Sequence, residues 1–106
     1  MNHWARVMII GSIVGTVGAA ASAQTGADVY KAKCQMCHGA DGTGDTPAGK
    51  TMKAPSFKSP EAKTMTDAEL TAIISKGKGK MPTYAGKLTP DEIKDLVAYI
   101  RTLEQK

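Results

Sequence analysis

The sequence Cys34-Gln35-Met36-Cys37-His38 constrains this chain more than any other stretch. It has the form C-x-x-C-H, which is the attachment sequence for a c-type haem. Two thiols separated by two residues can each add to one vinyl group of the same porphyrin, and the histidine that follows can place an imidazole nitrogen on the iron. The motif therefore predicts one covalent haem c, with Cys34 and Cys37 as the thioether residues and His38 as the first axial ligand.

The first 23 residues have the layout of a secretory signal. Arg6 supplies a positive charge, Val7 to Ala21 is an uncharged apolar run, and Ala21-Ser22-Ala23 is an A-x-A cleavage site. The apolar run is shorter than the ~20 residues of a spanning helix. We expect residues 1–23 to be removed on export and residues 24–106 to form one domain in the periplasm, without membrane insertion. An uncleaved signal that anchors the chain to the inner membrane is the alternative.

The remainder of the chain is poor in large side chains, with no tryptophan, one phenylalanine and three tyrosines. Domains of this size bury too little apolar surface to be stable without help. A Cys34–Cys37 disulfide would close only a very small loop and contribute little, whereas a buried haem supplies a large apolar plate. The net charge of +4 is modest, and no arginine-rich or aromatic-laced basic face indicates a nucleic-acid partner.

The pattern of caps and apolar residues predicts an all-α fold. Four helical segments are expected, each behind a serine or threonine that can cap it: about 27–36, a short turn from 60, 67–76 and about 90–104. The last two follow T-x-x-E capping boxes that begin at Thr66 and Thr89. Residues 39–54 carry four glycines and are expected to form a loop. No segment alternates with period two, so no sheet is expected.

A haem that carries electrons needs a second strong axial ligand. His3 lies in the predicted signal, so His38 is the only histidine left and ligation by two histidines is not expected. Four methionines remain: Met36, Met52, Met65 and Met81. Met36 sits inside the attachment motif and cannot cross to the other face, while Met65 is explained by packing beside a capping box. Met81, in a loop between two capped helices, is the predicted ligand; Met52 and an open site are the alternatives.

Taken together, these residues resemble the class I cytochromes c of the small bacterial and photosynthetic type. The resemblance covers about Ala27 to Leu103. It rests on C-x-x-C-H followed by glycine, on Gly77-Lys78-Gly79-Lys80-Met81-Pro82, and on a last helix that ends Val97-Ala98-Tyr99-Ile100.

The resemblance implies three to five helices wrapped around one haem, with the first and last helices crossing so that Tyr30 meets Tyr99. It also implies a proline carbonyl that accepts a hydrogen bond from the second ring nitrogen of His38 and so fixes its tautomer. Pro47 matches the family spacing best, and Pro55 is the rival.

The expected function is that of a monomeric one-electron carrier. An enzyme is not expected, because the motif uses both thiols and the histidine and leaves no acid–base pair or free nucleophile. Lysines bracket Met81 and would steer the carrier to acidic docking patches on redox partner proteins. They are Lys76, Lys78, Lys80 and Lys87. A solvated loop without any such role is the plainer explanation for these lysines.

Three other functions remain open. The chain could be a haem c subunit or an anchored partner of a larger oxidoreductase. It could be a haem protein with a labile methionine that turns over peroxide or binds a gas. Without haem, it could be a dithiol or a zinc protein. However, a dithiol has no need of His38 or Met81, and zinc needs four ligands where the motif supplies three.

Overall fold

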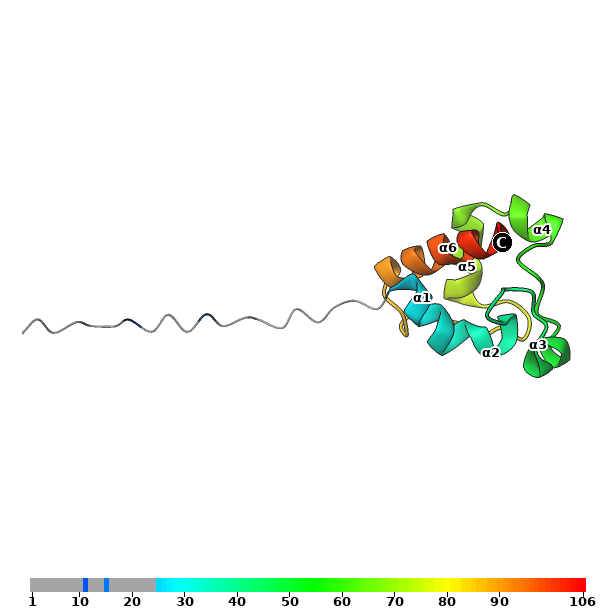
Figure 1. Cartoon of the computed structure of the whole chain (residues 1–106), viewed down its shortest axis with the longest axis horizontal. Coiled ribbons are helices and arrows are strands. Elements are labelled where there is room, and N and C mark those ends of the chain that lie inside the picture. The colour runs from blue at the N-terminus through cyan, green and yellow to red at the C-terminus, as the bar shows by residue number, and fades with distance from the viewer. Residues whose placement is uncertain (1–10, 12–14, 16–24) are drawn as a thin grey trace, which may run out of the picture.

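In a computed structural model of the chain, the described residues are 25–106 together with Gly11 and Gly15. The predicted signal at 1–23 therefore lies, apart from these two glycines, outside the described residues. The described part is helical and contains no strand, its only β pairing being two isolated bridges, Lys78 with Met81 and Ala85 with Leu88. Figure 1 shows the helices in chain order. For this part of the chain, the prediction of an all-α fold is confirmed.

The first helical stretch runs without a break from residue 26 to residue 38. It has three parts: α1 (Gly26–Val29), a π-helical segment η1 (Tyr30–Cys34) and α2 (Gln35–His38). The Thr25 hydroxyl caps it by accepting a hydrogen bond from the Asp28 N–H at 3.2 Å. The helix expected at 27–36 is thus present, and it extends through the whole haem motif. π-Helical insertions are rare and often occur at functional sites.

The expectation of a loop over residues 39–54 is partly wrong, because α3 (Pro47–Met52) forms inside it. The Thr46 hydroxyl accepts a hydrogen bond from the Gly49 N–H at 2.8 Å, and a proline occupies the first turn. This is an ordinary helix start that the surrounding glycines obscured. A Cβ on Gly49 would run into the carbonyl oxygen of Cys37. The glycine therefore allows α3 to pack directly against the end of the haem motif.

The three later helices lie where the sequence predicts them. They are α4 (Pro60–Thr64), α5 (Asp67–Lys76) and α6 (Pro90–Glu104). At α6 the capping box is complete, since the Thr89 hydroxyl accepts from the Glu92 N–H and the Glu92 carboxylate accepts from the Thr89 N–H, both at 3.1 Å. At α5 the Thr66 hydroxyl accepts from the Glu69 N–H at the same distance. In the described part of the chain, no helix has both the length and the apolar content that crossing a membrane requires.

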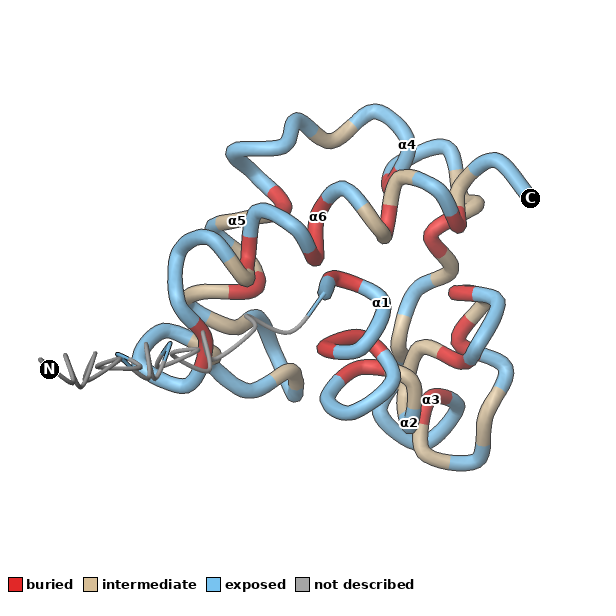
Figure 2. Tube along the Cα trace, turned by 60° about the vertical axis from the view of Figure 1, so that its left-hand side comes forward, coloured by how far each residue is buried: buried red, intermediate tan, exposed pale blue. Residues whose placement is uncertain are grey.

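Helix α6 crosses the first helical stretch and forms one wall of the core. Its buried side chains are Ile93, Leu96, Val97, Ile100 and Leu103, and in Figure 2 the buried parts of α6 lie on the side turned toward α1. A Cβ on Gly26 would run into the Asp95 carbonyl, so the two helices touch backbone to backbone. The rings of Tyr30 and Tyr99 meet with 5.2 Å between centroids. The predicted crossing, with Tyr30 against Tyr99, is confirmed.

Candidate haem site

The haem motif opens onto a cavity of about 870 Å³, within the range usual for small-molecule and cofactor sites. Cys34, Cys37 and His38 all line it, and so does Met81. The rest of the lining is largely apolar and comes from the loop after α3 and from α4, α5 and α6; it includes Phe57, Leu70, Ile73, Ile74, Leu96 and Ile100. A cavity this large and apolar, with two thiols and a histidine on its wall, fits a covalently attached porphyrin.

The two cysteines are free thiols on adjacent turns of the first helical stretch. Cys34 is buried at the end of η1, and Cys37 is half-buried in α2. Burial, with a smaller contribution from Cys37, raises the pKa of the Cys34 thiol to about 11. Cys34 therefore remains a neutral thiol at neutral pH. Both sulfur atoms are available to form thioethers with a porphyrin in the cavity.

The imidazole of His38 is held by packing. Its ring stacks on Phe57 with 4.6 Å between centroids and 19° between planes. Burial lowers the pKa of His38, and the backbone of Pro55 acts in the opposite direction. The ring therefore favours the neutral form, which is the form that binds metals. Its Nδ1 atom is buried, and no hydrogen bond of good geometry reaches it from the described residues. A buried ring nitrogen beside a backbone acceptor matches a histidine poised to ligate iron through its other nitrogen.

The backbone of Pro55 lies beside this histidine and acts on its pKa. Pro47 begins α3, and its carbonyl accepts a hydrogen bond from the Thr51 hydroxyl at 3.0 Å. Pro55 lines the cavity with His38, whereas Pro47 does not. The segment that begins at Pro47 forms helix α3, which the sequence did not predict.

Backbone pairing then brings Pro55 back to the motif. The N–H of Phe57 donates to the Gly42 carbonyl at 2.8 Å, and the N–H of Gly44 donates to the His38 carbonyl at 2.7 Å. A Cβ on Gly44 would stand 2.5 Å from the Ala54 carbonyl oxygen. Glycine at this position therefore allows the extended residues after α3 to lie close to the histidine.

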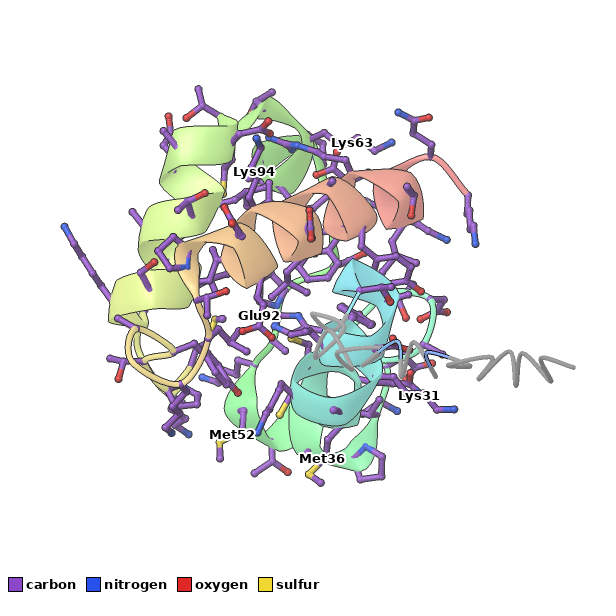
Figure 3. The ribbon with its side chains drawn as sticks, turned by 90° about the vertical axis from the view of Figure 1, so that its left-hand side faces the viewer. Lys31, Met36, Met52, Lys63, Glu92 and Lys94 are labelled. Atoms are coloured by element: carbon purple, nitrogen blue, oxygen red, sulfur yellow. The ribbon has the colours of Figure 1, made fainter. Side chains whose placement is uncertain are left out.

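The four methionines differ in their exposure and in whether they line the cavity. Met36 is 80% exposed, and Met65 packs against the core beside α5. Met52, Met65 and Met81 all line the cavity; Met52 is 46% exposed, whereas Met65 and Met81 are half-buried and pack against the core. Figure 3 shows Met36 and Met52 near the same lower edge of the molecule. Three methionines therefore line the cavity in which the haem would lie.

Met81 is more constrained than Met52. Its N–H donates to the Lys78 carbonyl at 2.9 Å, and its carbonyl accepts from the Lys78 N–H at 3.3 Å. A Cβ on Gly77 would stand 2.6 Å from the Met81 carbonyl oxygen. Met52, in contrast, is the last residue of α3, next to Lys53 in a left-handed conformation.

The four predicted docking lysines are all exposed, but they do not all border the cavity. Lys78 and Lys80 line it, whereas Lys76 and Lys87 do not. Two lysines that the sequence did not single out, Lys33 and Lys53, line it as well. They come from η1 and from the end of α3, so only the fold brings them to the cavity. The one sequence signal for them is that Lys33 immediately precedes the first haem cysteine.

Comparison with known proteins agrees with this geometry. The family model described as "Cytochrome C oxidase, cbb3-type, subunit III" matches residues 21–100. The chain is 37% identical over 82 residues to cytochrome c6 of Nostoc sp. (strain PCC 7120), covering 76% of this chain and 70% of that protein. It is 33% identical over 86 residues to cytochrome c6 of Leptolyngbya boryana, covering 81% and 98%.

A solved structure has the same fold. The structure titled "KustC0563 c-type cytochrome" superposes with a TM-score of 0.70 and 31% sequence identity, over 76% of this chain and 99% of that one. The resemblance noted in the motifs is therefore confirmed along most of the chain. The chain belongs to the class I cytochromes c, which carry one covalently bound haem c.

Proposed function

We propose that this protein is a one-electron carrier exported to the periplasm, with His38 and Met81 as the axial ligands of its haem iron. The observation that supports this most directly is that both thiols, the histidine and a constrained methionine line one apolar cavity of about 870 Å³. The haem, when bound, supplies the ferric/ferrous couple. The contribution of the chain is to bind and orient the haem and to keep water from it.

Each residue has a separate task in this proposal. Cys34 and Cys37 tether the porphyrin to the first helical stretch. Phe57 holds the plane of the His38 ring by stacking on it, and the Pro55 carbonyl would accept a hydrogen bond from Nδ1 once the histidine binds iron. Such outer partners fix the tautomer and the orientation of a ligating histidine. Tyr30 and Tyr99 act at a greater distance, by joining the helix of the motif to α6.

We favour Met81 over Met65 because Met65 packs against the core directly before the cap of α5. We favour Met81 over Met52 because a ligand must keep its position in both oxidation states. Met81 is packed against the core and held in a turn closed by two backbone hydrogen bonds. Met52 is nearly half exposed at the end of a six-residue helix. A thioether ligand also raises the reduction potential relative to a second histidine.

We propose that the partners are redox proteins with acidic docking patches. Lys33, Lys53, Lys78 and Lys80 line the cavity, and residues 24–106 carry 13 Lys and Arg against 10 Asp and Glu, a net charge of +3. Such a field raises the rate at which oppositely charged proteins meet, more than it tightens their final complex. Lys76 and Lys87 would belong to the outer part of the same surface. The carrier would act as a monomer after cleavage between Ala23 and Gln24.

Optical spectra of the mature holoprotein test the axial ligands. The ferric wild type should show the weak far-red band of a sulfur–iron bond. Met81→Ala should lose this band, whereas the matched variant Met52→Ala should keep it. If Met81→Ala kept the band and Met52→Ala lost it, Met52 would be the ligand. Rapid binding of carbon monoxide by the ferrous wild type would contradict a site closed by methionine.

A second candidate is a haem c subunit of a larger oxidoreductase, which the description of the matching family model favours. The two functions differ in the size of the native assembly. A free carrier should be recovered from the periplasmic fraction at the mass of one chain with one haem. Recovery in a membrane complex of several proteins would favour the subunit.

A further inference from the structure

Tyr84 connects two segments on either side of the haem cavity. Its N–H donates to the Ile74 carbonyl at 3.0 Å, and the N–H of the next residue, Ala85, donates to the Ser75 carbonyl at 3.1 Å. These bonds fasten Tyr84 to the last turns of α5. Its phenol O–H donates to the carbonyl of Lys33 at 3.2 Å, although the two residues are 51 positions apart. Residues 77–88 are called the Met81 loop below. The side chain of Tyr84 thus reaches from this loop to the helix of the haem motif.

The acceptor of this bond lies next to the site of covalent attachment. Lys33 belongs to η1 and immediately precedes Cys34, whose sulfur would tether the haem. The hydrogen bonds between Met81 and Lys78 close the loop on itself but do not join it to this helix. Within residues 25–106, the bond from Tyr84 to Lys33 is the one hydrogen bond between the segment from 77 to 88 and the segment from 26 to 38.

The surroundings of the ring favour a hydroxyl that stays in place. Tyr84 is half-buried, lines the cavity and packs against the core. The Nζ atom of Lys87 lies 5.6 Å from the centroid of its ring. Burial raises the pKa of Tyr84 above its ordinary value, so the hydroxyl remains a donor at neutral and mildly alkaline pH.

We propose that the bond from Tyr84 to Lys33 is a latch that holds the Met81 loop against the haem-bearing helix and so limits replacement of Met81 on the iron by outside ligands. The inference rests on the proposed axial role of Met81. An outside ligand needs the loop to swing away, so its apparent affinity equals its intrinsic affinity multiplied by the fraction of open molecules. Tyr84 is therefore a positioning residue that acts on the iron site through the segment that carries Met81.

The change expected when the hydrogen bond from Tyr84 to Lys33 is lost depends on its exposure to water. A hydrogen bond that water can replace stands at the low end of the usual net contribution, so its loss should enlarge the open fraction by about threefold. Tyr84→Phe removes the hydroxyl and keeps the ring against the core and below Lys87. Thr83→Ala is the matched control, because it removes a hydroxyl from an exposed neighbour in the same loop that makes no side-chain hydrogen bond within residues 25–106.

The test is a titration of the ferric holoprotein with imidazole, followed by loss of the far-red band. Tyr84→Phe should bind imidazole about threefold more tightly than the wild type, and Thr83→Ala should match the wild type. Amide hydrogen exchange should show the same change locally: exchange at the Met81 N–H should accelerate about threefold in Tyr84→Phe, with α6 unchanged. Equal imidazole affinities in Tyr84→Phe and wild type, or an equal gain in Thr83→Ala, would overturn the latch.

The outcomes separate this inference from the proposed function. If Met81→Ala kept the far-red band, the axial assignment would fail. Exchange at the Met81 N–H would still decide whether Tyr84 holds the loop. If Met81→Ala lost the band and neither imidazole affinity nor local exchange responded to Tyr84→Phe, the axial assignment would stand and the latch would be wrong.

Discussion

Replacing Gly77 with alanine should loosen the loop that carries Met81. Gly77 ends α5 with φ 77° and ψ 169°, a backbone conformation that residues with a side chain scarcely adopt. A Cβ there would stand 2.6 Å from the Met81 carbonyl oxygen and 3.1 Å from the Pro82 carbonyl carbon. Both atoms are backbone, so rotation of a side chain cannot relieve the overlap. The loop itself must shift, and Met81 moves with it.

The free-energy cost of Gly77→Ala can be estimated from the strained backbone conformation and from the overlap of the Cβ atom with the loop. The backbone conformation alone costs about 1–3 kcal/mol, and the overlap adds to it, so the closed loop should lose about 3 kcal/mol. This corresponds to about a hundredfold change in the equilibrium between closed and open loop. Gly79 offers a matched control in the same loop: its φ is 57°, and a Cβ would meet nothing within 4 Å. Gly79→Ala should therefore cost about 1 kcal/mol, the ordinary penalty of left-handed backbone.

Guanidinium titration of the ferric holoproteins measures the difference. In Gly77→Ala the far-red band should disappear at a much lower denaturant concentration than the helical circular dichroism, because the loop opens before the core unfolds. In Gly79→Ala the band should follow the wild type closely. Equal behaviour of the two variants would refute the reasoning, since only Gly77 lies against the backbone of the loop.

Three further predictions concern the rest of the fold and the docking surface. Tyr30→Phe should lower the free energy of unfolding by about 1–3 kcal/mol, because the Tyr30 hydroxyl is the buried donor to the Gly39 carbonyl at 2.6 Å; a denaturant midpoint equal to that of the wild type would contradict this. Thr89→Ala should cost about 1 kcal/mol by removing the cap of α6, and Thr89→Ser should recover most of it in the same measurement. Replacing Lys78 and Lys80 together with glutamine should slow electron transfer to an acidic partner at low salt and flatten its dependence on ionic strength; a salt dependence as steep as that of the wild type would exclude these two lysines from docking.

The sequence predicted those helices whose caps and apolar residues lie within the helix or directly beside it. The helices at 67–76 and 90–104 begin and end where their caps place them, because a cap and an apolar stripe act over a few neighbouring residues. Helix α3 was not predicted, since the glycines around it indicate a loop when they are counted without their contacts. Gly49 is required by its closeness to the Cys37 carbonyl, which no local pattern shows.

The residues of the haem site also differ in whether the sequence alone could identify them. The haem motif is contiguous, so its three residues could be identified without a structure. The proline beside His38 could not, because its position depends on how the chain from 39 to 57 folds back, and spacing alone favoured Pro47 over Pro55. Lys33 and Lys53 likewise reach the cavity only through the packing of two separate segments.

By itself, the sequence determined the cofactor, its attachment motif and the helical class, and it predicted the first axial ligand. Each of these depends on residues a few positions apart, where covalent geometry and local hydrogen bonds decide the outcome. The tertiary structure alone decided which proline lies beside His38, which lysines surround the cavity, and that Tyr84 reaches Lys33 across it. These are contacts between segments brought together by burial of a shared apolar core, and burial of this kind is not encoded in any one stretch of the chain.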